Sequence, residues 1–251
     1  MGNKKIIYYK QLDSTNAEVV RLAVQGAQSG TVVVADSQTA GKGRRGRTWE
    51  SPAKENIYMS MLLRPEVTVE RAPMLTIVMA YSIAQVIREY GFSQVQVKWP
   101  NDLILSGKKI CGILTEMQLK EAQIDYVVIG VGVNVNTREF PPELEEKASS
   151  LYLESGKLFD RAVLIERIVE NFNKTYEHFL KVQDLSFLCE AYNDMLVNVG
   201  REVQVLQPGR EYTAYALGIN SEGELRVRTA DGEEKHVYAG EVSVRGVYGY
   251  V

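Results

Sequence analysis

The sequence is poor in the residues from which several common kinds of site are built. Of its 251 residues only two are cysteine and two are histidine. Neither cysteine, Cys111 or Cys189, has the spacing from which a zinc site or a disulfide framework is read. The longest apolar stretch, residues 74–86, is interrupted by polar side chains and is too short to span a bilayer. A zinc fold, a disulfide-stapled secreted domain and a membrane span are therefore excluded.

A signal peptide is also missing, and so is an excess of charge of one sign. The first nine residues contain no apolar h-region and no small-residue cleavage site, so we predict a cytoplasmic protein. With 29 basic and 32 acidic residues the formal net charge is -3. This balance argues against a generic polyanion binder, because any attraction to phosphate or nucleic acid would have to be local.

What the chain does contain is the composition of an ordinary globular protein. It is 45% hydrophobic and 24% charged, and it is long enough for one large domain or a medium domain with a small appendage. The Thr15-x-x-Glu18 spacing, followed by apolar residues at helical period, predicts a helix that starts with a capping box and ends at Gly26. A helix capped by Asp160 should bury Leu164, Ile165, Ile168, Phe172, Tyr176 and Phe179 on one face.

The remaining pattern predicts an α/β (α+β) fold with a second, smaller unit. Strands are expected at 31–35, 56–62, 94–99, 103–105, 109–116 and 126–135, further helices at 73–91 and 185–195, and an acidic, turn-rich segment at 141–156. From about Val197 short alternating strands are separated by turns at 208–209, 221–223 and 231–232, which is typical of a small β-barrel. We therefore predict domains at 1–195 and 196–251.

The segment Gly41 to Arg47 packs four cations and three glycines into seven residues. Such a segment serves as a phosphate-binding nest or as a solvated basic loop, and taken alone it leaves both open. It is not a Walker A loop, because Asp36 stands where the first glycine should be and no Ser or Thr follows Lys42.

Three further segments carry polar groups or glycines at the ends of predicted strands. Lys98-Trp99-Pro100-Asn101-Asp102 offers a cation, an amide and a carboxylate, although Trp99 by itself is typical of a core residue. Lys108 and Lys109 precede a strand and by themselves are typical of a solvated edge. Gly130 to Asn136 runs a strand through two glycines, which marks either close approach of a ligand or backbone, or a bulge.

Taken together, these segments resemble the biotin protein ligase family. The resemblance rests on Asp13-Ser14-Thr15-Asn16, Gln38 to Arg47, Lys98 to Asp102, Lys109 with Gly112-Ile113-Leu114, and Gly130 to Asn134, which fall in the family's order. It covers about residues 4–190, with a family-like barrel beyond. It implies a mixed-sheet catalytic domain akin to class II aminoacyl-tRNA synthetases and a C-terminal SH3-like domain. Lys42 departs from the family pattern, in which arginine is common there, and loses the bidentate guanidinium fork.

The resemblance implies an enzyme that joins biotin to ATP as biotinyl-5'-AMP and passes the biotinyl group to a lysine of a biotin carboxyl carrier domain. Lys109 and Arg44 would be catalytic. The implied biotin-binding residues are Ser14, Thr15, Asn16, Gln38, Gly41, Lys42, Gly43, Arg44, Lys109 and Gly112. The implied nucleotide-binding residues are Arg44, Arg47, Trp49, Lys98, Asn101, Asp102 and Asn134. Mg2+ is the implied cofactor, with ligands left open, and a homodimer is one of the oligomeric states that the resemblance allows.

Such a reaction brings two anions together, so it needs positioning and cationic stabilisation more than a covalent nucleophile. His178 and His236 fall outside the motifs, so a histidine-based triad has little support. The closest rival is a lipoate protein ligase, against which the arginine-rich loop and the Lys98 to Asp102 segment favour biotin. The second rival is a nucleic-acid module, but residues 200–251 hold six Lys or Arg against eight Asp or Glu. Because catalytic-domain sequence begins within the first ten residues, we expect no sequence-specific DNA binding.

Overall fold

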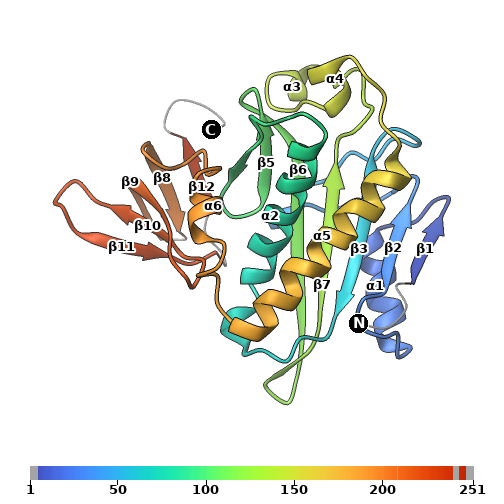
Figure 1. Cartoon of the computed structure of the whole chain (residues 1–251), viewed down its shortest axis with the longest axis horizontal. Coiled ribbons are helices and arrows are strands. Elements are labelled where there is room, and N and C mark those ends of the chain that lie inside the picture. Colours follow the sequence, from blue (N-terminus) through green and yellow to red (C-terminus); the bar gives the residue numbers. More distant parts are fainter. Residues whose placement is uncertain (1–4, 208, 240–242, 247–251) are drawn as a thin grey trace.

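The computed structural model describes residues 5–207, 209–239 and 243–246, which form two sheets (Figure 1). The larger sheet has seven strands in the order β1-β2-β3-β7-β6-β5-β4, and only β1 and β2 pair in parallel. Its strands are β1 (Ile6–Tyr9), β2 (Val32–Ala35), β3 (Ile57–Leu63), β4 (Gln96–Lys98), β5 (Asp102–Leu105), β6 (Lys108–Lys120) and β7 (Gln123–Val133). The smaller, antiparallel sheet contains β8 (Glu202–Gln207), β9 (Arg210–Ile219), β10 (Leu225–Arg228), β11 (Glu234–Val237) and β12 (Ser243–Gly246).

Helices cover both faces of the larger sheet. Helices α2 and α5 pack together on one face, and α1 lies on the other, as Figure 1 shows. The helices are α1 (Thr15–Val24), α2 (Met74–Glu89), α3 (Pro142–Glu145), α4 (Leu151–Ser155), α5 (Arg161–Val182) and α6 (Cys189–Asn193), with 3-10 turns η1 (Arg44–Gly46) and η2 (Val69–Arg71). The mixed α/β architecture expected from the sequence is confirmed.

The side-chain alternation of β7 explains how one strand serves both faces. Ile129, Val131 and Val133 point into the large core beneath α2 and α5. On the other face Tyr126 and Val128 pack in a small core under α1, and the next two positions on that face are Gly130 and Gly132. On the α1 side, β7 therefore packs against the helix at Tyr126 and Val128 and leaves space above Gly130 and Gly132.

Helix α5 forms as the sequence predicts. Its N-cap, Asp160, accepts hydrogen bonds from the backbone N–H groups of Ala162 and Val163 at 2.8 and 3.3 Å. The six apolar residues expected on one face are all buried. The helix ends at Gln183, which adopts a left-handed conformation with φ of 58°.

Three local expectations were wrong or incomplete. The capping box does not form: Ser14 is the N-cap of α1 without a side-chain bond, and Glu18 instead accepts from Tyr9 Oη and Arg21. The cause is that the Thr15 hydroxyl lies beside Gln38 Oε1 and Ser60 Oγ, at 3.1 and 2.7 Å, away from the helix backbone. The segment 141–156 contains the short helices α3 and α4, and strand β1 gave no clear signal in the sequence.

The smaller sheet is joined to the larger one by hydrogen bonds and packing. Backbone bonds connect Val97 of β4 to Met195 and Val197, so the chain leaves the larger sheet only after this point. The ring of Trp99 is 1% exposed, as the core interpretation predicted, and its Nε1 donates to the carbonyl oxygen of Gly223 at 3.0 Å. The division at 195/196 stays a prediction.

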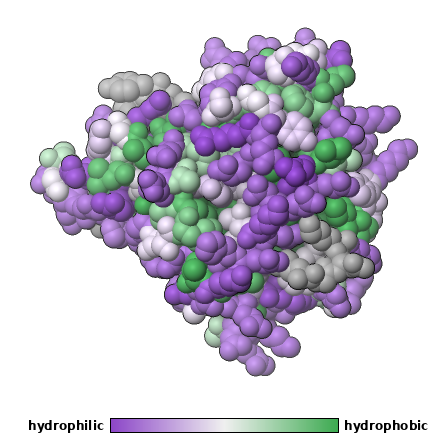
Figure 2. All heavy atoms as spheres, viewed as in Figure 1, coloured by the Kyte–Doolittle hydropathy of each residue, from purple (hydrophilic) through white to green (hydrophobic). Residues whose placement is uncertain are grey.

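Hydrophilic residues cover most of the face shown in Figure 2, with small apolar patches between them. Within the described ranges, no helix has the length and apolar character that crossing a membrane requires.

Candidate active site

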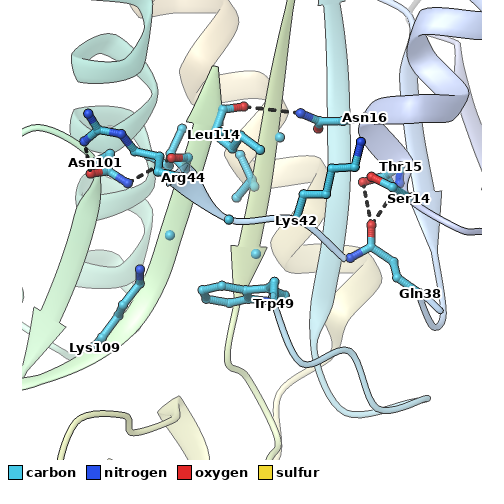
Figure 3. Close-up of a pocket in the computed structure, with 16 residues that line it drawn as sticks. Ser14, Thr15, Asn16, Gln38, Lys42, Arg44, Trp49, Asn101, Lys109 and Leu114 are labelled. Carbon is cyan, nitrogen blue, oxygen red and sulfur yellow. Dashed lines mark hydrogen bonds between the residues drawn. The ribbon is translucent and has the colours of Figure 1, made fainter. Parts of the chain in front are cut away.

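A pocket, partly open to solvent, lies on the α1 side of the larger sheet where the five sequence segments meet (Figure 3). Its lining combines the start of α1, the loops after β2 and β4, and the facing strands β6 and β7. Eleven of the residues predicted from the sequence line it: Ser14, Thr15, Asn16, Gln38, Lys42, Gly43, Arg44, Trp49, Asn101, Lys109 and Gly112.

One end of the pocket is lined by hydroxyl and amide groups. Gln38 Oε1 accepts from the backbone N–H of Thr15 at 2.8 Å, and Gln38 Nε2 donates to Ser51 Oγ at 3.0 Å. Ser14, Thr15 and Asn16 are all more than nine-tenths buried. Hydroxyl and amide groups held in this way can match a neutral ligand that carries both N–H donors and a carbonyl oxygen.

The floor is made by glycines over which two large side chains lie. A Cβ on Gly132 would come within 2.4 Å of the Trp49 ring, and a Cβ on Gly130 within 2.1 Å of Asn16 Oδ1. Gly112 of β6 stands opposite Gly132, so the indole rests on a bare part of the sheet. Of the two alternatives for these strand glycines, the structure therefore shows close approach and not a bulge.

The other end of the pocket carries cations. Arg44 donates from Nη1 to Asn101 Oδ1 at 2.9 Å and from Nη2 to the carbonyl oxygen of Ala239 at 3.1 Å. Burial lowers the pKa of Arg44, since desolvation penalises the guanidinium charge, while the nearby Asp102 carboxylate opposes the effect. An anionic ligand would relieve the same desolvation cost.

Lys109 lies beside Arg44 at this end, as Figure 3 shows, and is a site residue and not a solvated edge. Its Nζ forms a salt bridge with Asp102 Oδ1 at 2.7 Å and lies 5.3 Å from the centroid of the Trp49 ring. Its neighbour Lys108 points elsewhere and donates to the carbonyl oxygen of Glu145. The carboxylate thus holds Lys109 against the indole, ready to meet a second anion.

Five predicted residues do not line the pocket. Gly41 supports the loop through its carbonyl oxygen, which accepts from Trp49 N, and the carbonyl oxygen of Arg47 accepts from Gly43 N. Lys98 is buried at the end of β4. Asp102 reaches the site through Lys109, and Asn134 donates from Nδ2 to the carbonyl oxygen of Ser149, beside α4.

Sequence reasoning missed two polar residues next to the pocket, Ser60 and Glu116. Ser60 is completely buried in β3, where it contacts Thr15 and Asn16, and Glu116 of β6 accepts from Asn16. Ser60 had a signal in the sequence, because it is the only small hydroxyl residue in the apolar run Ile57–Leu63. Glu116 had none.

The histidines take no part in the site. His178 stacks on Phe187 with ring centroids 4.2 Å apart, and His236 lies beside Glu224 in the smaller sheet. Throughout the described residues, no group of three or more His, Cys, Asp or Glu side chains is arranged to hold a metal ion. The chemistry offered by this pocket is binding of a neutral polar group at one end and of anions at the other.

Comparison with known proteins gives the class to which this fold and site belong. Residues 8–134 match the model of the biotin/lipoate A/B protein ligase family, and residues 199–245 match that of the biotin protein ligase C-terminal domain. The chain belongs to this ligase family. The predicted fold class, a synthetase-like catalytic domain followed by an SH3-like domain, is confirmed.

Individual relatives match over most of their length. A bifunctional ligase/repressor, BirA, of Bacillus subtilis is 37% identical, covering 95% of this chain and 74% of its own. A biotin--[acetyl-CoA-carboxylase] ligase of Paracoccus denitrificans is 38% identical over 88% and 93%. The structure of a biotin protein ligase from Aquifex aeolicus in complex with biotin and ATP superposes with a TM-score of 0.85 at 30% identity, covering 97% of this chain and all of that one.

Proposed function

We propose that this protein is an ATP-dependent biotin ligase, and that the pocket holds biotin and ATP during formation of biotinyl-5'-AMP. The observation that carries the proposal is the division of one pocket into an end lined by hydroxyl and amide groups, with Thr15 and Gln38, and an end with Arg44 and Lys109. Biotin has a neutral ureido ring at one end and a carboxylate at the other, so its polarity matches that of the pocket. The relatives named as biotin ligases support the same substrate.

The reaction proceeds in two steps. A carboxylate oxygen of biotin attacks the α-phosphorus of ATP, an acyl-phosphate bond forms and pyrophosphate leaves. The neutral amine of a carrier lysine then attacks the carbonyl carbon, an amide forms, AMP leaves and the amine loses a proton. Lys109 and Arg44 lower the barrier of the first step by neutralising the two anions as they meet, since preorganised charge is usually the largest contribution in such sites.

The remaining assignments follow the same division. Ser14, Thr15, Asn16 and Gln38 contact the ureido ring, and Lys42 and Gly43 cover biotin from the loop. Trp49 offers its indole face to adenine above Gly132, and its buried Nε1 has no hydrogen-bond partner within the described part of the chain. Asn101 and Asp102 orient the phosphates through their bonds to Arg44 and Lys109.

Mg2+ fits this site only as a companion of the nucleotide. Asn101 and Asp102 are the neighbouring side chains with oxygen atoms, and Asn101 Nδ2 donates a hydrogen bond to Asp102 Oδ1 at 3.2 Å. Mg2+ is usually held by one or two carboxylates together with substrate phosphates. When bound with ATP, the ion would neutralise phosphate charge. Asn101 and Asp102 are the residues that would hold it.

The substrate test is ATP–pyrophosphate exchange in the presence of biotin, lipoate or neither. We expect exchange with biotin and only background with lipoate, because lipoate has no ureido group to match Ser14, Thr15 and Gln38. Exchange driven by lipoate but not by biotin would assign the chain to the lipoate branch of the family.

The protein substrate that we infer is a biotin carboxyl carrier domain, because relatives are named for acetyl-CoA carboxylase. Transfer of labelled biotin to such a domain, and not to its Lys→Arg variant, tests this assignment. Sedimentation velocity, with and without biotin and ATP, tests the homodimer that the resemblance allows. A cytoplasmic location agrees with two free cysteines, Cys111 and Cys189.

We also predict that the chain binds no DNA sequence specifically, on the grounds of its net charge of -3 and of an acidic C-terminal unit. The measurement is a gel-shift titration with a pool of random-sequence DNA duplexes in 0.15 M salt, with biotin and ATP present. A discrete complex that resists competitor DNA would contradict this prediction.

A further inference from the structure

The side chain of Asn16 is held between two residues that do not line the pocket. Asn16 Oδ1 accepts from Ser60 Oγ at 2.6 Å on one side, and Asn16 Nδ2 donates to Glu116 Oε2 at 2.6 Å on the other. The sheet provides for this arrangement, because Ser60 of β3, Gly130 of β7 and Leu114 of β6 stand opposite one another in one row. Asn16 lies across that row in the space that Gly130 leaves open.

The Glu116 carboxylate determines the orientation of the Asn16 side-chain amide. An ionised carboxylate only accepts hydrogen bonds, so the NH2 group of Asn16 must face Glu116 and the oxygen must face Ser60. Nδ2 also faces the carbonyl oxygen of Leu114, at 3.5 Å, which is another acceptor. Ser60 has a single hydroxyl proton, and an amide oxygen can only accept it. The Ser60 proton therefore points to Asn16.

This direction passes on to Thr15. Ser60 Oγ lies 2.7 Å from Thr15 Oγ1 and 2.6 Å from Asn16 Oδ1, and its one proton can serve only one of these two oxygens. With the Ser60 proton on Asn16, the Thr15 proton has two acceptors, Ser60 Oγ at 2.7 Å and Gln38 Oε1 at 3.1 Å, of which Ser60 is the nearer. The Thr15 hydroxyl is left with lone pairs only to offer to the pocket.

We propose that Glu116 is a positioning residue that determines specificity by setting the direction of the relay Thr15 to Ser60 to Asn16 to Glu116. In this direction Thr15 accepts a hydrogen bond from a ligand N–H. If the Asn16 amide turned over, Asn16 would donate to Ser60 and Ser60 to Thr15, and the Thr15 proton would be free to point at the ligand. The inference rests on the proposed function in one respect, since it assigns the ureido N–H of biotin as the donor that Thr15 accepts.

Three substitutions at Glu116 separate the relay from a general role of the charge. Glu116→Gln retains an oxygen that can accept from Asn16, so biotin should bind within about twofold of the wild type. Glu116→Ala removes the acceptor and should weaken biotin by about tenfold, the scale of one neutral hydrogen bond. Glu116→Lys presents only donors and should weaken it further. The control is Glu121→Lys, which makes the same charge change at the tip of the β6–β7 hairpin, away from Asn16, and should leave the affinity unchanged.

A double variant at Glu116 and Thr15 distinguishes the proposed relay from a merely structural role of Glu116. In a Thr15→Val chain the hydroxyl at the end of the relay is absent, so Glu116→Lys should cause no further loss of biotin affinity measured by titration calorimetry. Losses that add in the double variant, or Glu116→Gln binding as weakly as Glu116→Ala, would overturn the proposal.

The ligand-free protein supplies a measurement that does not depend on biotin. Nuclear Overhauser contacts of the Asn16 side-chain NH2 protons should reach Glu116 in the wild type and Ser60 in Glu116→Lys. If these contacts are seen and the wild type does not bind biotin, the substrate assignment fails and the relay stands. If biotin binds and the wild-type NH2 protons contact Ser60, the relay is overturned and the substrate assignment stands.

Discussion

Arg44 and Lys109 lie at the same end of the pocket and are held there by different elements. Lys109 forms a salt bridge with Asp102, at 2.7 Å. Arg44 donates to the oxygens of Asn101 and Ala239, and burial lowers its pKa. Lys109 is therefore positioned within the sheet, whereas Arg44 is presented from the glycine-rich loop. Removing each of them should have a different effect.

Lys109→Ala should reduce the single-turnover rate of adenylate formation by a factor of about 10² to 10³, since loss of one preorganised donor costs about 3 to 4 kcal/mol in comparable sites. Folding should change little, because Lys109 is partly exposed and contributes one salt bridge. The matched control is Lys108→Ala, which removes the adjacent lysine outside the pocket. Equal rates for the two variants would show that Lys109 has no role in the reaction.

Arg44→Gly should let the adenylate escape faster and label lysines on bystander proteins. The reason is that closure of a glycine-rich loop must be driven by cation contacts, and a guanidinium forks onto phosphate oxygens where Lys42 offers a point charge. A chase experiment measures the adenylate off-rate. Arg45→Gly is the control for the loss of a cation from the loop, because Arg45 donates to the carbonyl oxygen of Leu206, outside the pocket; its φ of 58° also accommodates glycine without strain. An unchanged off-rate in Arg44→Gly would contradict the assignment.

Strand β7 owes its function to a change in residue type along one face. Val128 packs beneath α1, whereas Gly130 and Gly132 make room for Asn16 and Trp49. β-Branched residues in place of Gly130 and Gly132 would be equally compatible with a β-strand, since it is the opposite face of β7 that packs in the large core. The glycines therefore exist for the pocket and not for the fold.

Gly130→Ala tests this explanation, because its methyl group would overlap Asn16 Oδ1, only 2.1 Å away. We expect weaker biotin binding and a loss of about 1 to 3 kcal/mol in the free energy of unfolding, the usual cost of overpacking. Asn16→Ala in the same chain should restore much of the stability but not the affinity. Chemical denaturation and calorimetry measure the two quantities, and purely additive losses of stability would show that the clash lies elsewhere.

At the scale of the whole molecule, the C-terminal unit contacts the catalytic motifs at several points within the described residues, two of which involve Arg44 and Trp99. Ala239 accepts from Arg44 in the loop, and Gly223 accepts from the indole of Trp99, two residues before Asn101. The contact with Trp99 is fully buried, whereas the one with Arg44 lies at the edge of the pocket. The C-terminal unit therefore supports the cationic end of the site and does more than follow it in the chain.

Trp99→Phe removes the indole donor from this junction and leaves the Gly223 carbonyl oxygen unsatisfied. We expect unfolding to become easier by about 2 to 4 kcal/mol, from the lost hydrogen bond together with the smaller ring. Urea denaturation measures this loss. Trp49 then remains as the only tryptophan, so its fluorescence reports on nucleotide binding in the same variant. Wild-type stability would show that the junction does not depend on Trp99.

The amino-acid sequence by itself determined the features that depend on short-range pattern. The helix after Asp160, the apolar strand at 126–135 and the change to short strands after Val197 follow from local periodicity and capping. The site residues Thr15, Arg44 and Lys109 were identified through the resemblance to the biotin protein ligase family, since by local pattern alone Lys109 is typical of a solvated edge.

Only the tertiary structure decided which distant residues meet. The Asn16 amide bonds to a carboxylate 100 positions away, and Arg44 to a carbonyl 195 positions away. The capping box was wrong for the same reason: Thr15 had a tertiary partner in Gln38 that local spacing could not reveal. Strand register and packing create such pairs, and neither is encoded in the neighbourhood of a single residue, so Ser60 and Glu116 emerged only once β3, β7 and β6 were placed side by side.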